Sequence, residues 1–130
     1  MATVVTNAGL AIVTNKLIAA GTEPLNIGWG TGATSATQTG TSLSTEVLVS
    51  GVAGGTDHTV GTSSRVTTTV TNDTYQVTGT RTATGTVTIT NAGLFDAASG
   101  GTLFLWGNFG SVALVNGDAI AFTIKAIQTN

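Results

Sequence analysis

Between residues 78 and 90 the chain alternates strictly between threonine and other residues. Threonine occupies every even position, and the odd positions hold Gly79, Arg81, Ala83, Gly85, Val87 and Ile89. Successive side chains of a strand point to opposite faces, so a period of two predicts strands, whereas a helix needs a period near 3.6. With a reversal expected at residues 83–85, the run predicts two strands. One face of this ribbon should be a neutral surface of hydroxyl and methyl groups.

The first twenty residues follow a different pattern. Apolar residues recur at helical spacing between Thr6, a residue type that caps helix starts, and Gly21, a type that follows helix ends. Pro24 blocks any continuation. We therefore expect one amphipathic helix over about residues 6–20. Its predicted apolar stripe consists of Leu10, Val13, Leu17 and Ile18.

Further strands are predicted by apolar segments that are separated by turn residues. These segments cover residues 25–29, 47–49, 65–71, 102–106 and 119–127, with turns at Asn72-Asp73 and Asn116-Gly117-Asp118. In the last strand we expect a core face made of Ile120, Phe122, Ile124 and Ala126. The pattern predicts a mainly β fold, an antiparallel β-sandwich or barrel with one N-terminal α-helix. Residues 1–130 should form a single domain, with a β-rich body over about residues 25–128.

Charge is scarce along the whole chain. Only 8% of residues are charged, against roughly 25% in an ordinary soluble domain. Because a free monomer normally keeps a charged surface for solubility, we expect partner proteins to cover much of this one. The four basic residues are widely scattered, which argues against nucleic acid as a partner, since nucleic-acid binding depends on clustered Lys and Arg.

Membrane and secretion signals are likewise missing from the pattern. No apolar run approaches the roughly 18 residues of a membrane span, so we expect no membrane partner. The N-terminal residues lack the basic start and apolar core of a secretion signal, and we expect synthesis in the cytoplasm. The chain has no cysteine, which excludes disulfides and thiolate chemistry.

The residues that could carry chemistry do not form a recognisable motif. The segment Gly28-Trp29-Gly30-Thr31-Gly32 lacks the helix start and lysine that follow a phosphate-binding loop. His58, the sole histidine, stands beside Asp57, but adjacent residues of a strand face opposite ways, so we expect a solvated loop histidine. We predict no catalytic residue, no cofactor and no metal site, and we expect the protein not to be an enzyme.

The large side chains supply the candidates for a partner interface. These candidates are Trp29, Trp106, Phe109 and Arg81. Burial in the core is the ordinary role of an aromatic residue, but interfaces favour tryptophan because it has much area and few rotatable bonds. Trp106 precedes Gly107-Asn108, where a strand should emerge at an edge. An exposed tryptophan beside Asn108 also suggests, as an alternative, a carbohydrate-binding adhesin module.

Three segments carry a resemblance to a known class of proteins. They are VVTNAGL at 4–10, EPLNIGWGTG at 23–32 and ITNAGLFDAASGGTLF at 89–104, followed by the Gly117-Asp118 turn and an apolar final strand. In order and over nearly the whole chain, they resemble small virion structural proteins of tailed bacteriophages, most closely capsid decoration (cement) proteins. The third segment also resembles stretches of phage tail and fibre proteins.

The resemblance implies a structural role in the virion. A decoration protein binds the outer surface of the capsid and stabilises the contacts between capsomers. The implied partners are the major capsid protein and further copies of the chain, with a homotrimer favoured. The implied location is the outer capsid surface of a particle assembled in a bacterial host. A phage tail, baseplate or fibre component is the alternative function.

Overall fold

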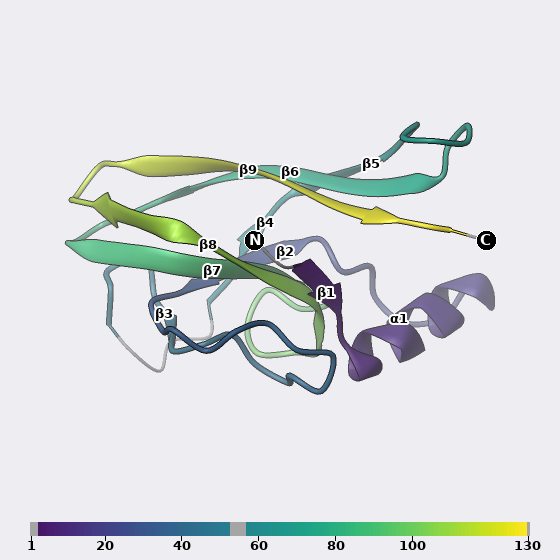
Figure 1. Cartoon of the computed structure of the whole chain (residues 1–130), viewed down its shortest axis with the longest axis horizontal. Helices are drawn as coiled ribbons and strands as arrows, with labels where there is room; N and C mark the ends of the chain where they lie inside the picture. Colours follow the sequence, from purple (N-terminus) through teal and green to yellow (C-terminus); the bar gives the residue numbers. More distant parts are fainter. Residues whose placement is uncertain (1–2, 53–56, 130) are drawn as a thin grey trace.

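The computed structural model describes residues 3–52 and 57–129, which form a two-layer antiparallel β-sandwich with one helix (Figure 1). In the larger sheet the order is β1 (Thr3–Val5), β8 (Leu103–Leu114), β7 (Val87–Phe95), β2 (Asn26–Gly30) and β3 (Glu46–Val47), with β4 (Thr59–Val60) also paired to β2. The smaller sheet has the order β5 (Thr62–Val66), β6 (Thr74–Thr82) and β9 (Ala119–Ile127). The predicted fold class is confirmed, and of its two forms the sandwich is the one found.

The threonine-rich run forms two strands, as predicted, but they belong to different sheets. Strand β6 ends at Thr82 in the smaller sheet and β7 begins at Val87 in the larger one. The connection crosses between the layers and is held at Ala83, whose amide donates to the Asp118 carbonyl at 2.7 Å. The reversal at residues 83–85 is therefore an arch between sheets rather than a hairpin.

The connection from β8 to β9 is a second arch of the same kind. The predicted turn at residues 116–118 is confirmed, with Gly117 at φ +94°, a conformation that suits glycine. Strand β8 is much longer than the predicted segment 102–106, because it continues through a glycine-rich stretch to Leu114. Figure 1 shows β9 lying over β8 in the opposite layer rather than beside it in one sheet.

Helix α1 (Asn7–Leu17) is shorter than predicted and buries a different face. Thr6 caps it as expected, because its hydroxyl accepts the Gly9 amide at 2.9 Å. The predicted stripe is wrong, since Leu10 and Leu17 are 58% and 83% exposed, whereas Gly9 and Ile12 are buried. The reason is close packing on β8, where a side chain at Gly9 would stand 2.2 Å from the Phe104 carbonyl oxygen.

The segment predicted as a strand over residues 65–71 is mostly a loop. Strand β5 ends at Val66, and the chain then turns back to β6. The carboxylate of Asp73 accepts the amides of Thr68, Thr69 and Val70, each at 2.8 Å. These bonds satisfy amides that a strand would otherwise use, so the loop is held by the turn residue that the sequence had indicated.

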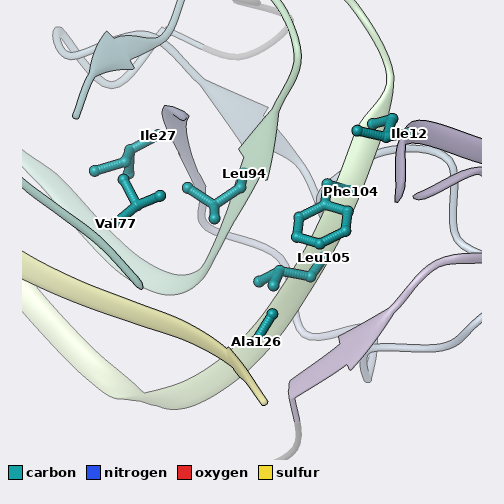
Figure 2. Packing of buried hydrophobic residues seen from close by; sticks show 7 residues of the cluster. All are labelled: Ile12, Ile27, Val77, Leu94, Phe104, Leu105 and Ala126. Atoms are coloured by element: carbon teal, nitrogen blue, oxygen red, sulfur yellow. The ribbon is translucent and has the colours of Figure 1, made fainter. Parts of the chain in front are cut away.

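The hydrophobic core fills the space between the sheets. The cluster in Figure 2 joins α1, both sheets and the start of β8. It consists of Ile12, Ile27, Val77, Leu94, Phe104, Leu105 and Ala126. The second cluster, around Trp29 and Ile89, also lies between the sheets. The third, around Phe95 and Trp106, lies on the outer side of the larger sheet and includes Leu43 and Ala36 from the loop before β3. On β9 the predicted core face does point inward, but Ile120, Phe122 and Ile124 are only half-buried.

Candidate interaction surface and buried charge cluster

The outer side of the smaller sheet is a nearly neutral surface, which we call the threonine face. Strand register places side chains of β5, β6 and β9 in rows across it, for example Thr62, Thr78 and Thr123 in one row. Most of its members are exposed. The face consists of Thr62, Ser64, Gln76, Thr78, Thr80, Thr82, Ala119, Ala121, Thr123 and Lys125.

Lys125 alone is charged among these ten side chains. Hydroxyl and amide groups can both donate and accept hydrogen bonds, and the methyl groups of threonine and alanine offer apolar area. A partner that packs on this face has only one charge to pair, that of Lys125, and an unpaired buried charge is costly. The face therefore suits protein–protein contact.

Four ionisable side chains gather around strand β2, in a group that we call the charge cluster. It consists of Glu46, Asp57, His58 and Arg81. Arg81 of β6 lies between the sheets, where its Nη1 donates to the Ile27 carbonyl at 3.5 Å. Glu46 of β3 and His58 lie on the other side of the larger sheet, where a side chain at Gly28 would meet both of them. The Asp57 side chain, just before His58, is 46% exposed.

Arg81 is the most deeply buried charge of this cluster, with 1% of its side chain exposed. Its Nη2 donates to the carbonyl of Asp57 at 2.9 Å and to the carboxylate of Asp57 at 3.2 Å, and its Nη1 donates to Thr59 Oγ1 at 3.0 Å. The guanidinium carbon lies 4.9 Å from the centre of the Trp29 ring, a cation–π contact. Burial lowers the pKa of Arg81, and the nearby Asp57 carboxylate partly opposes that shift.

His58 is buried rather than solvated, so the prediction of a loop histidine in water is wrong. Its Nδ1 lies 2.8 Å from the Ala97 carbonyl oxygen, and its Nε2 lies 2.7 Å from Glu46 Oε1. The ring stacks on Phe95 with centroids 3.9 Å apart. A carbonyl only accepts, so Nδ1 carries a proton, and the bond to Glu46 holds a second proton that comes from either partner.

The charge cluster forms few openings to solvent, and its most exposed side chain is Asp57, at 46%. None of its four residues lines either of the two cavities described. Within residues 3–52 and 57–129, no group of three or more His, Cys, Asp or Glu side chains could hold a metal ion. The polar atoms of the cluster are mostly committed to one another and to backbone carbonyls. Arg81 joins the smaller sheet to the larger one, and the bond between Glu46 and His58 joins β3 to the segment before β4.

The four residues predicted for a partner interface lie mostly in the interior. Trp29, Trp106 and Arg81 are 0%, 2% and 1% exposed, so these three side chains present almost no surface to a partner in this structure. Trp106 is covered by the loop of residues 31–45, and its Nε1 donates to the Thr37 carbonyl at 3.0 Å. Phe109 is half-buried and lines an open cavity, so it alone of the four remains available.

That cavity, which we call the β8–β9 groove, has a volume of about 500 Å³ and opens along one side of the sandwich. Its walls are largely apolar and come from the facing strands β8 and β9. The side chains that matter below are Leu105, Phe109, Val112, Ile120, Phe122 and Ile124. The groove explains why the inward face of β9 is only half-buried, and no sequence pattern distinguished it from a closed core.

Comparison of the chain with protein-family models, with curated proteins and with solved structures found no match. No helix within the described ranges has the length and apolar character needed to cross a membrane.

Proposed function

We propose that the protein is a non-enzymatic structural subunit of a bacteriophage virion, and specifically a capsid decoration protein that binds the outer surface of the shell. The observation that carries the proposal is the threonine face, a flat and nearly uncharged surface across three strands. The resemblance of three segments to phage virion proteins supplies the biological setting. The major capsid protein and sister copies are the proposed partners, and the trimeric state stays a prediction.

The threonine face fits this role for a physical reason. Contacts between ions weaken as salt screens them, with a Debye length of about 10 Å at 0.1 M. Contacts made by hydroxyl, amide and methyl groups depend far less on salt. A shell component with such a face would stay bound over a wide range of ionic strength. Many copies on one lattice would also gain from effective concentration, so each contact can be modest.

A binding experiment on shells that lack the protein tests the proposal. We expect the purified chain to saturate sites on the shell, and its occupancy to change little between about 50 and 500 mM salt. A steep loss of occupancy over that range would count against contacts made by the threonine face.

Two threonine variants make the test specific. Thr80→Glu places a carboxylate on the threonine face, whereas Thr88→Glu places one at an exposed position of β7 in the other sheet. Both residues lie within strands and both are exposed, so the two variants perturb folding to a similar degree. We expect Thr80→Glu to lose shell binding and Thr88→Glu to keep it. Equal binding by the two variants would contradict the proposed contact surface.

A tail, baseplate or fibre subunit is the second candidate, because one of the three resembling segments is common to both kinds of phage protein. Imaging labelled protein on intact particles separates the two, since a decoration protein labels shells and a tail component labels tails. The adhesin alternative depended on an exposed tryptophan beside Asn108. Trp106 is buried, so that argument no longer supports it.

A further inference from the structure

The β8–β9 groove is a part of the sandwich where the two sheets are not fully packed against each other. Phe122 and Ile124 on β9, together with Leu105 and Phe109 on β8, line an open space of about 500 Å³. Half-buried apolar residues on facing strands normally meet other side chains, because protein interiors are packed to high density. The groove therefore exposes apolar side chains that a partner would bury. The strand edges beside it indicate the kind of partner that fits.

The strand edges of the molecule differ greatly in length. The edges at β1, β3, β4 and β5 are formed by strands of three, two, two and five residues. Strand β9 forms an edge nine residues long, and no described residue pairs with its outer side. Short edge strands protect a protein against unwanted pairing, whereas a long edge is a template for another strand. Lys125 is the one charged residue within β9.

Strand β8, on the opposite wall of the groove, also has a free edge. Strand β1 pairs only with residues Leu105, Trp106 and Gly107 of β8. From residue 108 to Leu114 the same side of β8 has no partner among the described strands. An apolar groove between two free strand edges matches an incoming β-structure better than a small molecule, because a strand satisfies main-chain groups as well as side chains.

We propose that two copies of the chain associate through β9, paired antiparallel about a two-fold axis, so that their grooves close against each other. An antiparallel strand pair about a two-fold axis is self-complementary, because each strand supplies the same edge to the other. The two smaller sheets would then join into one continuous sheet across the axis. The pairing goes beyond the proposed function, since it requires no shell, and it gives a two-fold dimer where the resemblance implies a trimer.

The register follows from the length and composition of β9. Full overlap of Ala119–Ile127 with its copy places Thr123, the middle residue, on the axis. Inside the groove, Phe122 then faces Ile124 of the second copy, a favourable pairing of an aromatic with a β-branched residue. On the outer face, Lys125 meets Ala121 rather than a second lysine, so no like charges stand opposite each other.

The threonine face gives an independent reason to favour a second copy over a foreign strand. Its rows run across β5, β6 and β9 and end at the β9 edge, where Thr123 closes the row of Thr62 and Thr78. Two-fold pairing continues each row into the second copy and doubles the neutral surface. A foreign strand would satisfy the edge but would end the rows there.

A cysteine cross-link tests the axis directly, because the natural chain has no cysteine. Thr123→Cys should form a disulfide-linked dimer on mild oxidation, since the two side chains meet at the axis. Thr62→Cys is the matched control, because Thr62 lies in the same row at the opposite edge and is also exposed. We expect it to stay monomeric on a non-reducing gel. Equal cross-linking of the two variants would overturn the proposal.

Two charge variants at Ala121 test the register without disturbing the interior, because this side chain is exposed. Ala121→Lys places a lysine opposite Lys125 of the second copy, and Ala121→Glu places a carboxylate there. With two such pairs in each dimer, we expect the dimer dissociation constants of the two variants to differ by about 2- to 30-fold, with the lysine variant weaker. Identical constants at low salt would overturn the register.

Light scattering on the wild-type protein measures its oligomeric state directly. We expect a dimer that dissociates on dilution. A monomer at all concentrations, or a trimer that forms no disulfide at Thr123→Cys, would overturn the pairing. Either result would leave shell binding by the threonine face standing, so the failure of this inference and the failure of the proposed function can be told apart.

Discussion

The space between the two sheets contains two regions that differ in how they are filled. Around Arg81 the space between the sheets holds a buried guanidinium that donates to backbone carbonyls, to Thr59 and to the half-exposed Asp57 carboxylate. Around Phe109 it is apolar and open to one side. Phe122 lies between the two regions, with its ring centre 6.5 Å from that of Trp29 and 6.4 Å from that of Phe109.

The two regions differ in whether their groups find partners within the single chain. Strands β3 and β4 both pair with β2, and the polar groups of the charge cluster find their partners within one chain. Strand β1 covers only three residues of β8, and nothing described covers the rest of that edge. The charge cluster should therefore govern the stability of the single chain, and the β8–β9 groove should govern association.

The largest effect should come from removing the buried cation of the charge cluster. Arg81→Ala leaves the Asp57 carboxylate and several carbonyls without their donor and opens a cavity over Trp29. We expect a loss of about 2–5 kcal/mol in the free energy of unfolding, as for other large-to-small substitutions at buried sites. Denaturant titration measures it. Arg65→Ala, at an exposed arginine, is the control and should change stability by less than about 0.5 kcal/mol.

A smaller loss is expected from the second pair of the cluster. Glu46→Ala removes the partner of His58 Nε2 and leaves a buried ring nitrogen unsatisfied, which costs about 1–3 kcal/mol. Glu46→Gln keeps the volume, and its amide can donate to the neutral imidazole, so we expect it to lose less. Thermal unfolding of the two variants side by side checks this order. A glutamine variant as unstable as the alanine variant would show that charge, and not hydrogen bonding, dominates this pair.

The corresponding change in the groove should affect stability less. Phe109 is half-buried, so Phe109→Ala removes only part of the roughly 1.5–3 kcal/mol that full burial of such a side chain contributes. We expect a loss of about 1 kcal/mol in the unfolding of the single chain, measured at high dilution. If the loss matched that of Arg81→Ala, the groove would be a closed core and the comparison would fail.

The smallest effect lies outside both regions, at the loop before β6. Amides of Val70, Thr68 and Thr69 hold the pKa of Asp73 well below its ordinary value of 3.8. A lowered pKa means that the bonds stabilise the fold above about pH 4 and that this contribution is lost as the pH falls further. We expect Asp73→Asn to lower the melting temperature at pH 7, and to lower it by less at pH 2, where part of the contribution has been lost. A constant difference across this range would contradict the assignment.

Local features of the fold could be predicted from sequence because they depend on near neighbours. The alternation of residues 78–90 predicts strands, Thr6 predicts the start of α1, and Gly117 marks the turn before β9. Each rests on backbone preference or on side-chain periodicity within a few residues. These predictions held even where the strand partners were unknown.

The arrangement of partners could not be predicted in the same way. Glu46 and His58 are 12 residues apart and Asp57 and Arg81 are 24 apart, and both pairs depend on which strand lies beside which. Alternation predicts that Arg81 and Thr80 face opposite sides of β6, but not which side becomes the interior. The same reason explains the error at α1, where close approach at Gly9 decided the buried face.

The central claim is that the protein works through contact area on the threonine face, and a density map of an intact virion at side-chain resolution tests it most directly. We predict that Thr78, Thr80 and Thr82 lie against another protein in every bound copy. A particle in which these side chains face only solvent would contradict the account, whatever else the chain contacts.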